Sequence, residues 1–307
     1  MINKQNLSKL GIGGWGIGGF MEKDPDNDDQ KQIKALTHQF NKGMNLTEIN
    51  LWNSQGHSAR LTKQALDASN INRKDIMLVQ AIYDYNLPTI EDVKKEFELC
   101  LEIYETDHVD AVEFPLTAYE KYGFDELVQL IQEYISKGKT RYISVTNFNL
   151  EYLKKIHQIF GEKLFSHELH YSFDVRDNED MGILDYAFEN NIINIPFQPL
   201  RRNRTAQRNW PILVELAKKY GKTQNQIILN WMTTRKMHPL VKSESIEHID
   251  ENLEALEFEM DKEDVKRLTD FRVPNYKAQE IDWFKQDKKG IFIAQLPNVF
   301  DEQYPHN

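Results

Sequence analysis

Polar side chains suited to a reaction centre lie at or just after the ends of short apolar runs. Glu48, Asn53, Glu113 and His170 are the candidates for catalysis. Carboxylates and an imidazole that converge on one site can act as general acids and bases. These residue types also suit a metal shell, but their spacing contains no H-E-x-x-H-like signature, so we expect no metal.

A basic run, LRRNRTAQR at 200–208, follows a later apolar run. Arg201 and Arg202 could hold a carboxylate or phosphate of a substrate, because guanidinium groups bind both in a bidentate manner. A blander interpretation is that these arginines pair with Glu48 and Glu113 and leave an inert site. The residues alone leave both interpretations open.

Short β-branched or aromatic runs alternate with helix-period segments, and these elements would position the candidates. Thr89 is a candidate N-cap, and the segment 209–234 is expected to form two helices that are split at Gly221. Several strand candidates are apolar on both faces, as in a covered parallel sheet. They cover residues 7–15, 44–51, 75–83, 108–116, 140–148, 164–173, 192–200 and 238–245.

Eight strand–helix units in about 250 residues predict an α/β fold, a closed (β/α)8 TIM barrel. The alternative is an open doubly wound sheet. We expect one barrel domain over 1–272 and a C-terminal extension over 273–307. In such barrels chemistry takes place at the C-terminal ends of the strands. Strand parity turns Glu113 inward and places Glu168 and His170 on one face.

The opening run LGIGGWGIGGF contains G-x-G-x-x-G at Gly11, Gly13 and Gly16. In dinucleotide-binding folds this motif follows a strand and opens a helix. Here it runs into MEKDPDNDD, which has the composition of a turn and a helix cap. We therefore do not interpret the run as a phosphate-binding turn of the Rossmann type.

Bulk composition limits the class of protein. The net charge of −10 argues against a nucleic-acid partner, which would need a basic face. No apolar stretch approaches the ~20 residues needed to span a bilayer, and the N-terminus has no apolar signal region, so we expect no membrane partner. The single cysteine, Cys100, is expected to be buried and fits a reducing compartment, so we expect a cytoplasmic protein.

Several ordered motifs resemble the aldo-keto reductase family. They are GIGGWGIGG near the start, KGMNL…GHSARLTKQAL at 42–66, SKGKTRYISVTNFN at 136–149, NIPFQPL at 194–200 and SESIEHIDENLEAL at 243–256. The resemblance covers roughly residues 7–272. It implies the same barrel, with the glycine run as a turn at its mouth and Trp15 beside a small-molecule substrate.

The family reduces carbonyls with NADPH, using an Asp, a Tyr acid, a Lys and a His. The corresponding positions here are Glu48, Asn53, Ala81 and Pro115. An asparagine is no general acid near neutral pH, and alanine carries no charge to lower the pKa of a neighbour. The resemblance therefore implies that the ordinary reductase proton relay is absent.

The resemblance also implies where NADP(H) would bind. Hydroxyl, amide and aromatic groups persist at the nicotinamide positions, although a carboxylate replaces the usual glutamine: Thr146, Asn147, Glu168 and Phe197. The positions at the adenine end are Lys242, Ser243, His248, Glu251 and Asn252. His248 stands where the family has an arginine, which weakens contact with a 2′-phosphate. Cofactor binding stays open.

Three functions remain open. The protein could catalyse a different acid–base step at the barrel mouth, or act as a non-catalytic binding or regulatory protein. Alternatively, it is an active NADPH-dependent oxidoreductase with substitute groups. In the family the C-terminal segment folds over the mouth, so Trp283 could line the substrate pocket there, or its aromatic neighbours could form a surface for a protein partner.

Overall fold

Eight parallel strands form the centre of the molecule in the computed structural model, which describes residues 2–274. Their order in the sheet is β7-β6-β5-β4-β3-β2-β1-β8. The strands are Gly11–Ile12 (β1), Leu46–Ile49 (β2), Met77–Ala81 (β3), Val109–Pro115 (β4), Thr140–Thr146 (β5), Leu164–His170 (β6), Ile193–Phe197 (β7) and Leu240–Val241 (β8).

The two ends of this sheet meet. The backbone N–H of His238, just before β8, donates to the carbonyl of Asn194 in β7 at 3.0 Å. The sheet therefore closes into the predicted (β/α)8 barrel, and the open doubly wound alternative is wrong. Each of the eight strands lies within its predicted range.

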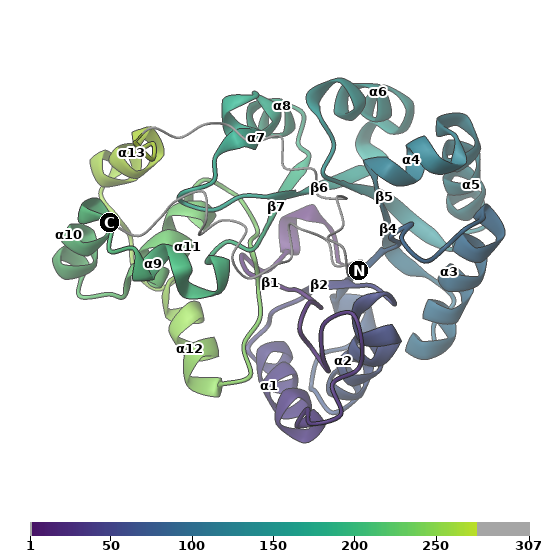
Figure 1. The fold of residues 1–307 in the computed structure, drawn as a ribbon, viewed down its shortest axis with the longest axis horizontal. Coiled ribbons are helices and arrows are strands. Elements are labelled where there is room, and N and C mark those ends of the chain that lie inside the picture. The colour runs from purple at the N-terminus through teal and green to yellow at the C-terminus, as the bar shows by residue number, and fades with distance from the viewer. Residues whose placement is uncertain (1, 275–307) are drawn as a thin grey trace, which may run out of the picture.

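Helices surround the barrel (Figure 1). They are Asp29–Asn41 (α1), His57–Asp67 (α2), Ile90–Tyr104 (α3), Leu116–Tyr122 (α4), Phe124–Ser136 (α5), Leu150–Phe160 (α6), Asp177–Asp180 (α7), Ile183–Glu189 (α8), Arg204–Gln207 (α9), Pro211–Tyr220 (α10), Gln224–Thr234 (α11), Ile246–Glu254 (α12) and Lys262–Asp270 (α13). None of the helices within residues 2–274 is long and apolar enough to cross a membrane.

Local sequence signals account for several boundaries. Thr89 and Asp92 form a reciprocal capping box that starts α3. Gly221 ends α10 with φ of +63°, a left-handed conformation that glycine adopts without strain. The glycine run leads from β1 into a turn and then into the cap of α1 at Asp28, so it is not followed directly by a helix. These predictions are confirmed.

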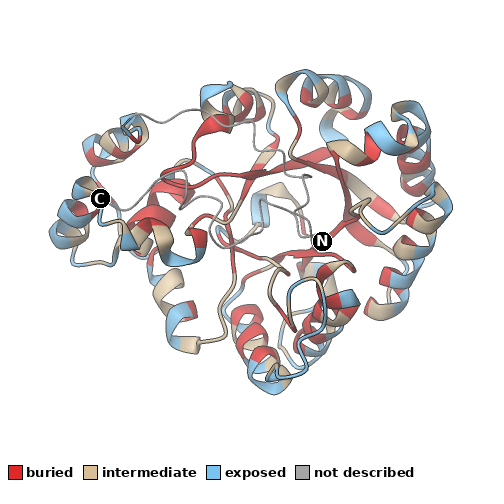
Figure 2. Cartoon of the chain, viewed as in Figure 1, coloured by how far each residue is buried: buried red, intermediate tan, exposed pale blue. Residues whose placement is uncertain are grey.

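Burial separates the barrel into a filled lower part and a polar mouth. The strands form a nearly continuous buried ring, while the helices expose their outer faces (Figure 2). Apolar side chains from different strands fill the barrel interior, among them Leu46, Met77, Val79, Ala111, Phe165 and Ile195. Closer to the C-terminal ends of the strands, β2, β4 and β6 carry the buried glutamates Glu48, Glu113 and Glu168. The site must therefore lie above this apolar plug.

The predicted C-terminal extension, 273–307, lies outside the described residues except for its first two positions. The predictions that place Trp283 over the mouth, or in a surface for a protein partner, lie outside them as well.

Candidate functional site

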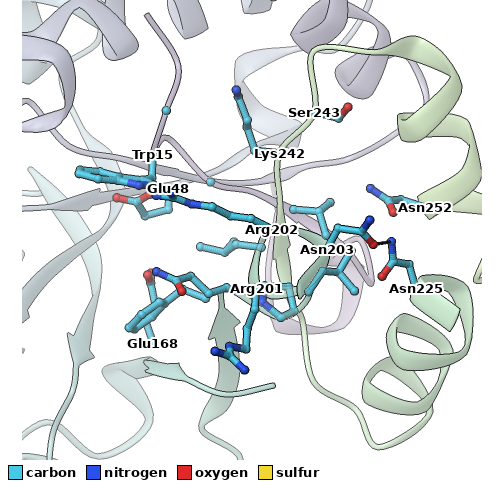
Figure 3. Close-up of a pocket in the computed structure, with 18 of the residues that line it drawn as sticks. Trp15, Glu48, Glu168, Arg201, Arg202, Asn203, Asn225, Lys242, Ser243 and Asn252 are labelled. Carbon is cyan, nitrogen blue, oxygen red and sulfur yellow. Dashed lines mark hydrogen bonds between the residues drawn. The ribbon is translucent and has the colours of Figure 1, made fainter. Parts of the chain in front are cut away.

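One cavity of about 800 Å³ opens at the C-terminal ends of the strands. Trp15, Glu48 and Glu168 lie at one end of it, and Ser243, Asn225 and Asn252 lie at the other, with Arg202 between them (Figure 3). Pockets for small molecules typically measure about 300–1,000 Å³. The cavity is large enough for an elongated ligand.

Glu48 extends from β2 into the first end of the cavity. Its carboxylate accepts hydrogen bonds from the backbone N–H of Gly14, at 3.2 Å, and from the side-chain amide of Asn50, at 2.8 Å. The oxygen of the same Asn50 amide accepts from the backbone N–H of Asn53 at 2.7 Å. Burial raises the pKa of Glu48, and the two donated bonds oppose that rise. The glycine run thus helps to hold Glu48.

Glu113 and Glu168 form a carboxyl pair inside the barrel. Glu113 is completely buried, and neither of its oxygens reaches an N–H or O–H donor within residues 2–274. Its side chain instead hydrogen-bonds to that of Glu168. Such a bond requires a proton on one of the two carboxyls.

Burial and the neighbouring negative charges raise the pKa values of both Glu113 and Glu168 well above the ordinary range. The pair therefore holds at least one proton at neutral pH. It is a proton reservoir beside the cavity, because Glu168 lines the cavity directly.

Tyr83 is a site residue that the sequence analysis missed. It follows the end of β3, lines the cavity, and its phenol interacts electrostatically with Glu168, Glu48 and Glu113. Burial, followed by these negative charges, raises its pKa well above the usual value. Strand parity could have indicated Tyr83, because positions 79, 81 and 83 share the inward face if the strand is extended beyond Ala81.

The remaining catalytic candidates lie at different distances from the cavity. Asn53 lines it and is buried. His170 is buried behind the cavity wall, with its ring centroid 5.4 Å from that of Phe197. Burial lowers the pKa of His170 well below the usual value, so the imidazole is neutral. No set of three His, Cys, Asp or Glu side chains among residues 2–274 is arranged to hold a metal ion.

Most of the residues predicted to bind a cofactor line the same cavity. Asn147, Glu168 and Phe197 lie on the wall at the first end, whereas Thr146 is buried outside the cavity. The predicted residues of the far end also line it: Lys242, Ser243, His248, Glu251 and Asn252.

Lys242 already has an acidic partner. Its Nζ donates to Glu244 at 2.7 Å. The exposed His248 has no comparable acidic partner among the described residues. An anionic group that binds here would have to compete with Glu244 for the ammonium of Lys242.

The arginines do not neutralise the glutamates. Arg201 is buried and donates to Asp174 at 2.9 Å, and no salt bridge joins an arginine to Glu48 or Glu113 within residues 2–274. The interpretation of an inert mouth built on such pairs is therefore wrong. Arg202 is exposed, and its guanidinium lies 5.2 Å from the ring centroid of Phe20. Both arginines line the cavity.

Comparisons with known proteins identify the same family as the sequence motifs. The family model described as "Aldo/keto reductase family" matches residues 9–272. An NADPH-dependent alpha-keto amide reductase of Saccharomyces cerevisiae is 26% identical over 208 residues, which span 64% of this chain and just under two thirds (66%) of that enzyme. An NADP-dependent D-sorbitol-6-phosphate dehydrogenase of Malus domestica is 26% identical over 254 residues, or 76% of this chain and 75% of the relative.

Solved structures agree in fold. A thermostable aldo-keto reductase, solved with the inhibitor epalrestat, superimposes with a TM-score of 0.77 and 27% identity. The superposition covers 85% of this chain and 94% of the other. Together with the barrel, its closure and the residues at its mouth, these matches show that the chain belongs to the aldo/keto reductase family.

Proposed function

We propose that the protein is an NADP(H)-dependent oxidoreductase that works without the ordinary proton relay of its family. The observation that carries the proposal is the single continuous cavity. It joins Asn147 and Phe197, at the nicotinamide positions of the family, to Ser243 and Asn252, at the adenine positions. Both named relatives depend on NADPH or NADP by their names, which supports the same choice of cofactor here.

The residues present fit such a cofactor. At the nicotinamide end Asn147 offers an amide and Phe197 a ring face, and at the far end Ser243 and Asn252 offer polar groups beside Lys242. A bound reduced nicotinamide supplies a hydride. The residues of the chain then have to place the substrate and manage its proton, and the Glu113–Glu168 pair, beside Tyr83, is where a proton is held.

A second candidate is a protein that binds a small molecule at the mouth without redox chemistry. Two features favour it: Glu244 occupies the ammonium of Lys242, and a carboxylate, Glu168, replaces the family's glutamine. Both features weaken cofactor binding. Replacement of the reductase tetrad, at Asn53 and Ala81 above all, stays a prediction from the sequence and suits either candidate.

Titration with NADPH tests the proposal. Trp15 and Trp52 line the cavity with their rings stacked at 5.5 Å, so a bound nicotinamide should quench tryptophan fluorescence. We expect saturable binding in the micromolar range, which corresponds to about −8 kcal/mol. No saturation up to millimolar NADPH or NADH, about −4 kcal/mol, would contradict the proposal and favour the second candidate.

Restoring the family's arginine is expected to strengthen NADPH binding. In His248→Arg a guanidinium becomes available to the 2′-phosphate, so we expect Kd for NADPH to fall about tenfold, or ~1.4 kcal/mol. Kd for NADH, which lacks that phosphate, should not change. Glu120→Gln is the matched control, because it also makes the net charge one unit more positive but lies on the exposed face of α4. Equal tightening of both nucleotides would contradict a 2′-phosphate contact.

A further inference from the structure

The first end of the cavity is acidic, and no basic side chain of the described residues neutralises it. Neither Glu48 nor Glu168 forms a salt bridge with a lysine or arginine within residues 2–274, although both line the cavity. Glu168 is only 4% exposed, and apart from the carboxyl of Glu113 its Oε2 has no hydrogen-bond partner there. A buried carboxyl oxygen whose only partner is another carboxyl, on the wall of a cavity, is a group that a positively charged ligand would satisfy.

Aromatic rings also line this end of the cavity. The Trp52 ring centroid lies 5.5 Å from that of Trp15, 5.0 Å from that of Tyr85 and 6.3 Å from that of Tyr83. The rings of Tyr83 and Tyr85 stack at 5.5 Å. All four line the cavity. The faces of aromatic rings carry negative potential and attract cations, most strongly when the cation is shielded from water.

The other titratable groups around this end do not cancel its negative charge. His170 on β6 is neutral, and Tyr83 after β3 is a neutral phenol. The basic groups that line the cavity have other contacts: Arg201 bonds to Asp174, Arg202 lies over the ring of Phe20, and Lys242 bonds to Glu244. Glu48, Glu113 and Glu168 therefore set the potential here.

We propose that this end of the cavity binds the substrate as a cation, with an iminium or ammonium nitrogen held between Glu168 and the rings of Trp52 and Tyr83. The reduction of this cation rests on the proposed redox function, whereas its binding does not. The substrate class that it names is the protonated or N-alkylated imine, and the amine is the product.

An iminium substrate also removes the need for the missing proton donor. Hydride addition to a carbonyl carbon leaves an alkoxide, which requires a proton and is disfavoured beside carboxylates. Hydride addition to the carbon of an iminium group forms a C–H bond, and the π electrons of the carbon–nitrogen double bond become the lone pair of a neutral amine. The reductant is NADPH, which is oxidised to NADP⁺, and no proton has to be delivered.

The binding step can be tested without cofactor. Calorimetric titration would compare N-methyl-3,4-dihydroisoquinolinium with 1-tetralone, a neutral ketone of the same bicyclic shape. We expect the cation to bind at least tenfold more tightly. Its binding should release protons, seen as a dependence of the heat on the buffer, because a bound cation favours ionised carboxyls. Affinity should accordingly rise with pH.

One variant and one control check that the Glu168 carboxyl causes the preference for the cation. Glu168→Gln is expected to lose most of the preference for the cation, whereas Glu120→Gln, exposed on α4, should keep it. Equal affinity for cation and ketone, or a preference that survives Glu168→Gln, would overturn the inference.

Failure of this inference and failure of the proposed function give different results. If NADPH binds but the cation is not preferred, only the cationic substrate class is wrong. If the cation is preferred but neither nucleotide binds, the cation subsite stands and the redox function fails. The reaction itself is followed by the absorbance of NADPH. A decrease of this absorbance with the iminium compound but not with 1-tetralone would support both the redox function and the cationic substrate class. A decrease with 1-tetralone but not with the iminium compound would overturn the cationic substrate class.

Discussion

Replacing Glu113 by glutamine is expected to raise the free energy of unfolding at pH 7, although the side chain is completely buried. Its folded-state pKa lies well above the unfolded value of about 4.3 because the carboxyl is buried beside other negative charges. Below the pKa of the unfolded chain, both the folded and the unfolded state hold the proton, and the carboxyl does not lower the free energy of unfolding. As the pH rises through that value, the unfolded chain releases the proton while the folded chain keeps it.

Stability therefore falls with rising pH until the folded-state pKa is reached, by about 1.4 kcal/mol per pH unit for each retained proton. Glutamine does not titrate, and its amide can donate to Glu168, so Glu113→Gln avoids this loss. We expect the variant to exceed the wild type by more than ~1 kcal/mol at pH 7 and to match it near pH 4.

Urea unfolding across that pH range measures the difference. Glu120→Gln serves as the control, because an exposed carboxyl on α4 should change stability little at any pH. A variant that is less stable than the wild type at pH 7, or a difference that does not vary with pH, would contradict the protonated carboxyl pair.

The barrel could be predicted from the sequence because its signals are local. Each apolar run marks a strand, Thr89 with Asp92 marks the start of α3, and Gly221 marks the end of α10. Parity along the strands also indicated that Glu113 points inward and that Glu168 and His170 share a face. These signals depend on only a few consecutive residues.

Contacts across the barrel could not be predicted in that way. Which inward residues meet depends on the stagger between strands, and the pairing of β5 with β6 shifts between Ile143 and Ser144. The hydrogen bond between Glu113 and Glu168 follows from this geometry. Asp174 was missed for another reason: it lies in the loop after β6, where the sequence has no periodic pattern.

Asp174 anchors the loop that forms one wall of the cavity. Its carboxylate accepts from Arg201 and Thr205, each at 2.9 Å, and from the hydroxyl of Ser172, also at 2.9 Å. The anchored loop contains four non-glycine residues with positive φ: Gln198, Arg201, Arg202 and Asn203. Such conformations cost of order 1–3 kcal/mol each and persist only where surrounding contacts hold them.

Asp174→Asn is therefore expected to destabilise the protein by about 3–5 kcal/mol, because it removes the negative charge beside the buried guanidinium of Arg201. The four strained residues of the loop wall can then relax. We expect weaker NADPH binding in the same variant, since Arg201, Arg202 and Asn203 line the cavity. Thermal unfolding and the fluorescence titration measure the two effects.

A matched control separates this buried pair from an ordinary surface one. Glu133→Gln removes the exposed carboxylate that pairs with Lys137, and it should destabilise the protein far less than Asp174→Asn and leave NADPH binding unchanged. The double variant Asp174→Leu/Arg201→Met removes both charges of this pair together and should be less destabilised than Asp174→Asn, because the buried guanidinium of Arg201 is then no longer left without its carboxylate. Two results would show that Asp174 does not shape the cavity wall through Arg201. One is that Asp174→Asn destabilises the protein no more than Glu133→Gln. The other is that Asp174→Asn lowers stability but, at temperatures where the variant is still folded, binds NADPH as tightly as the wild type.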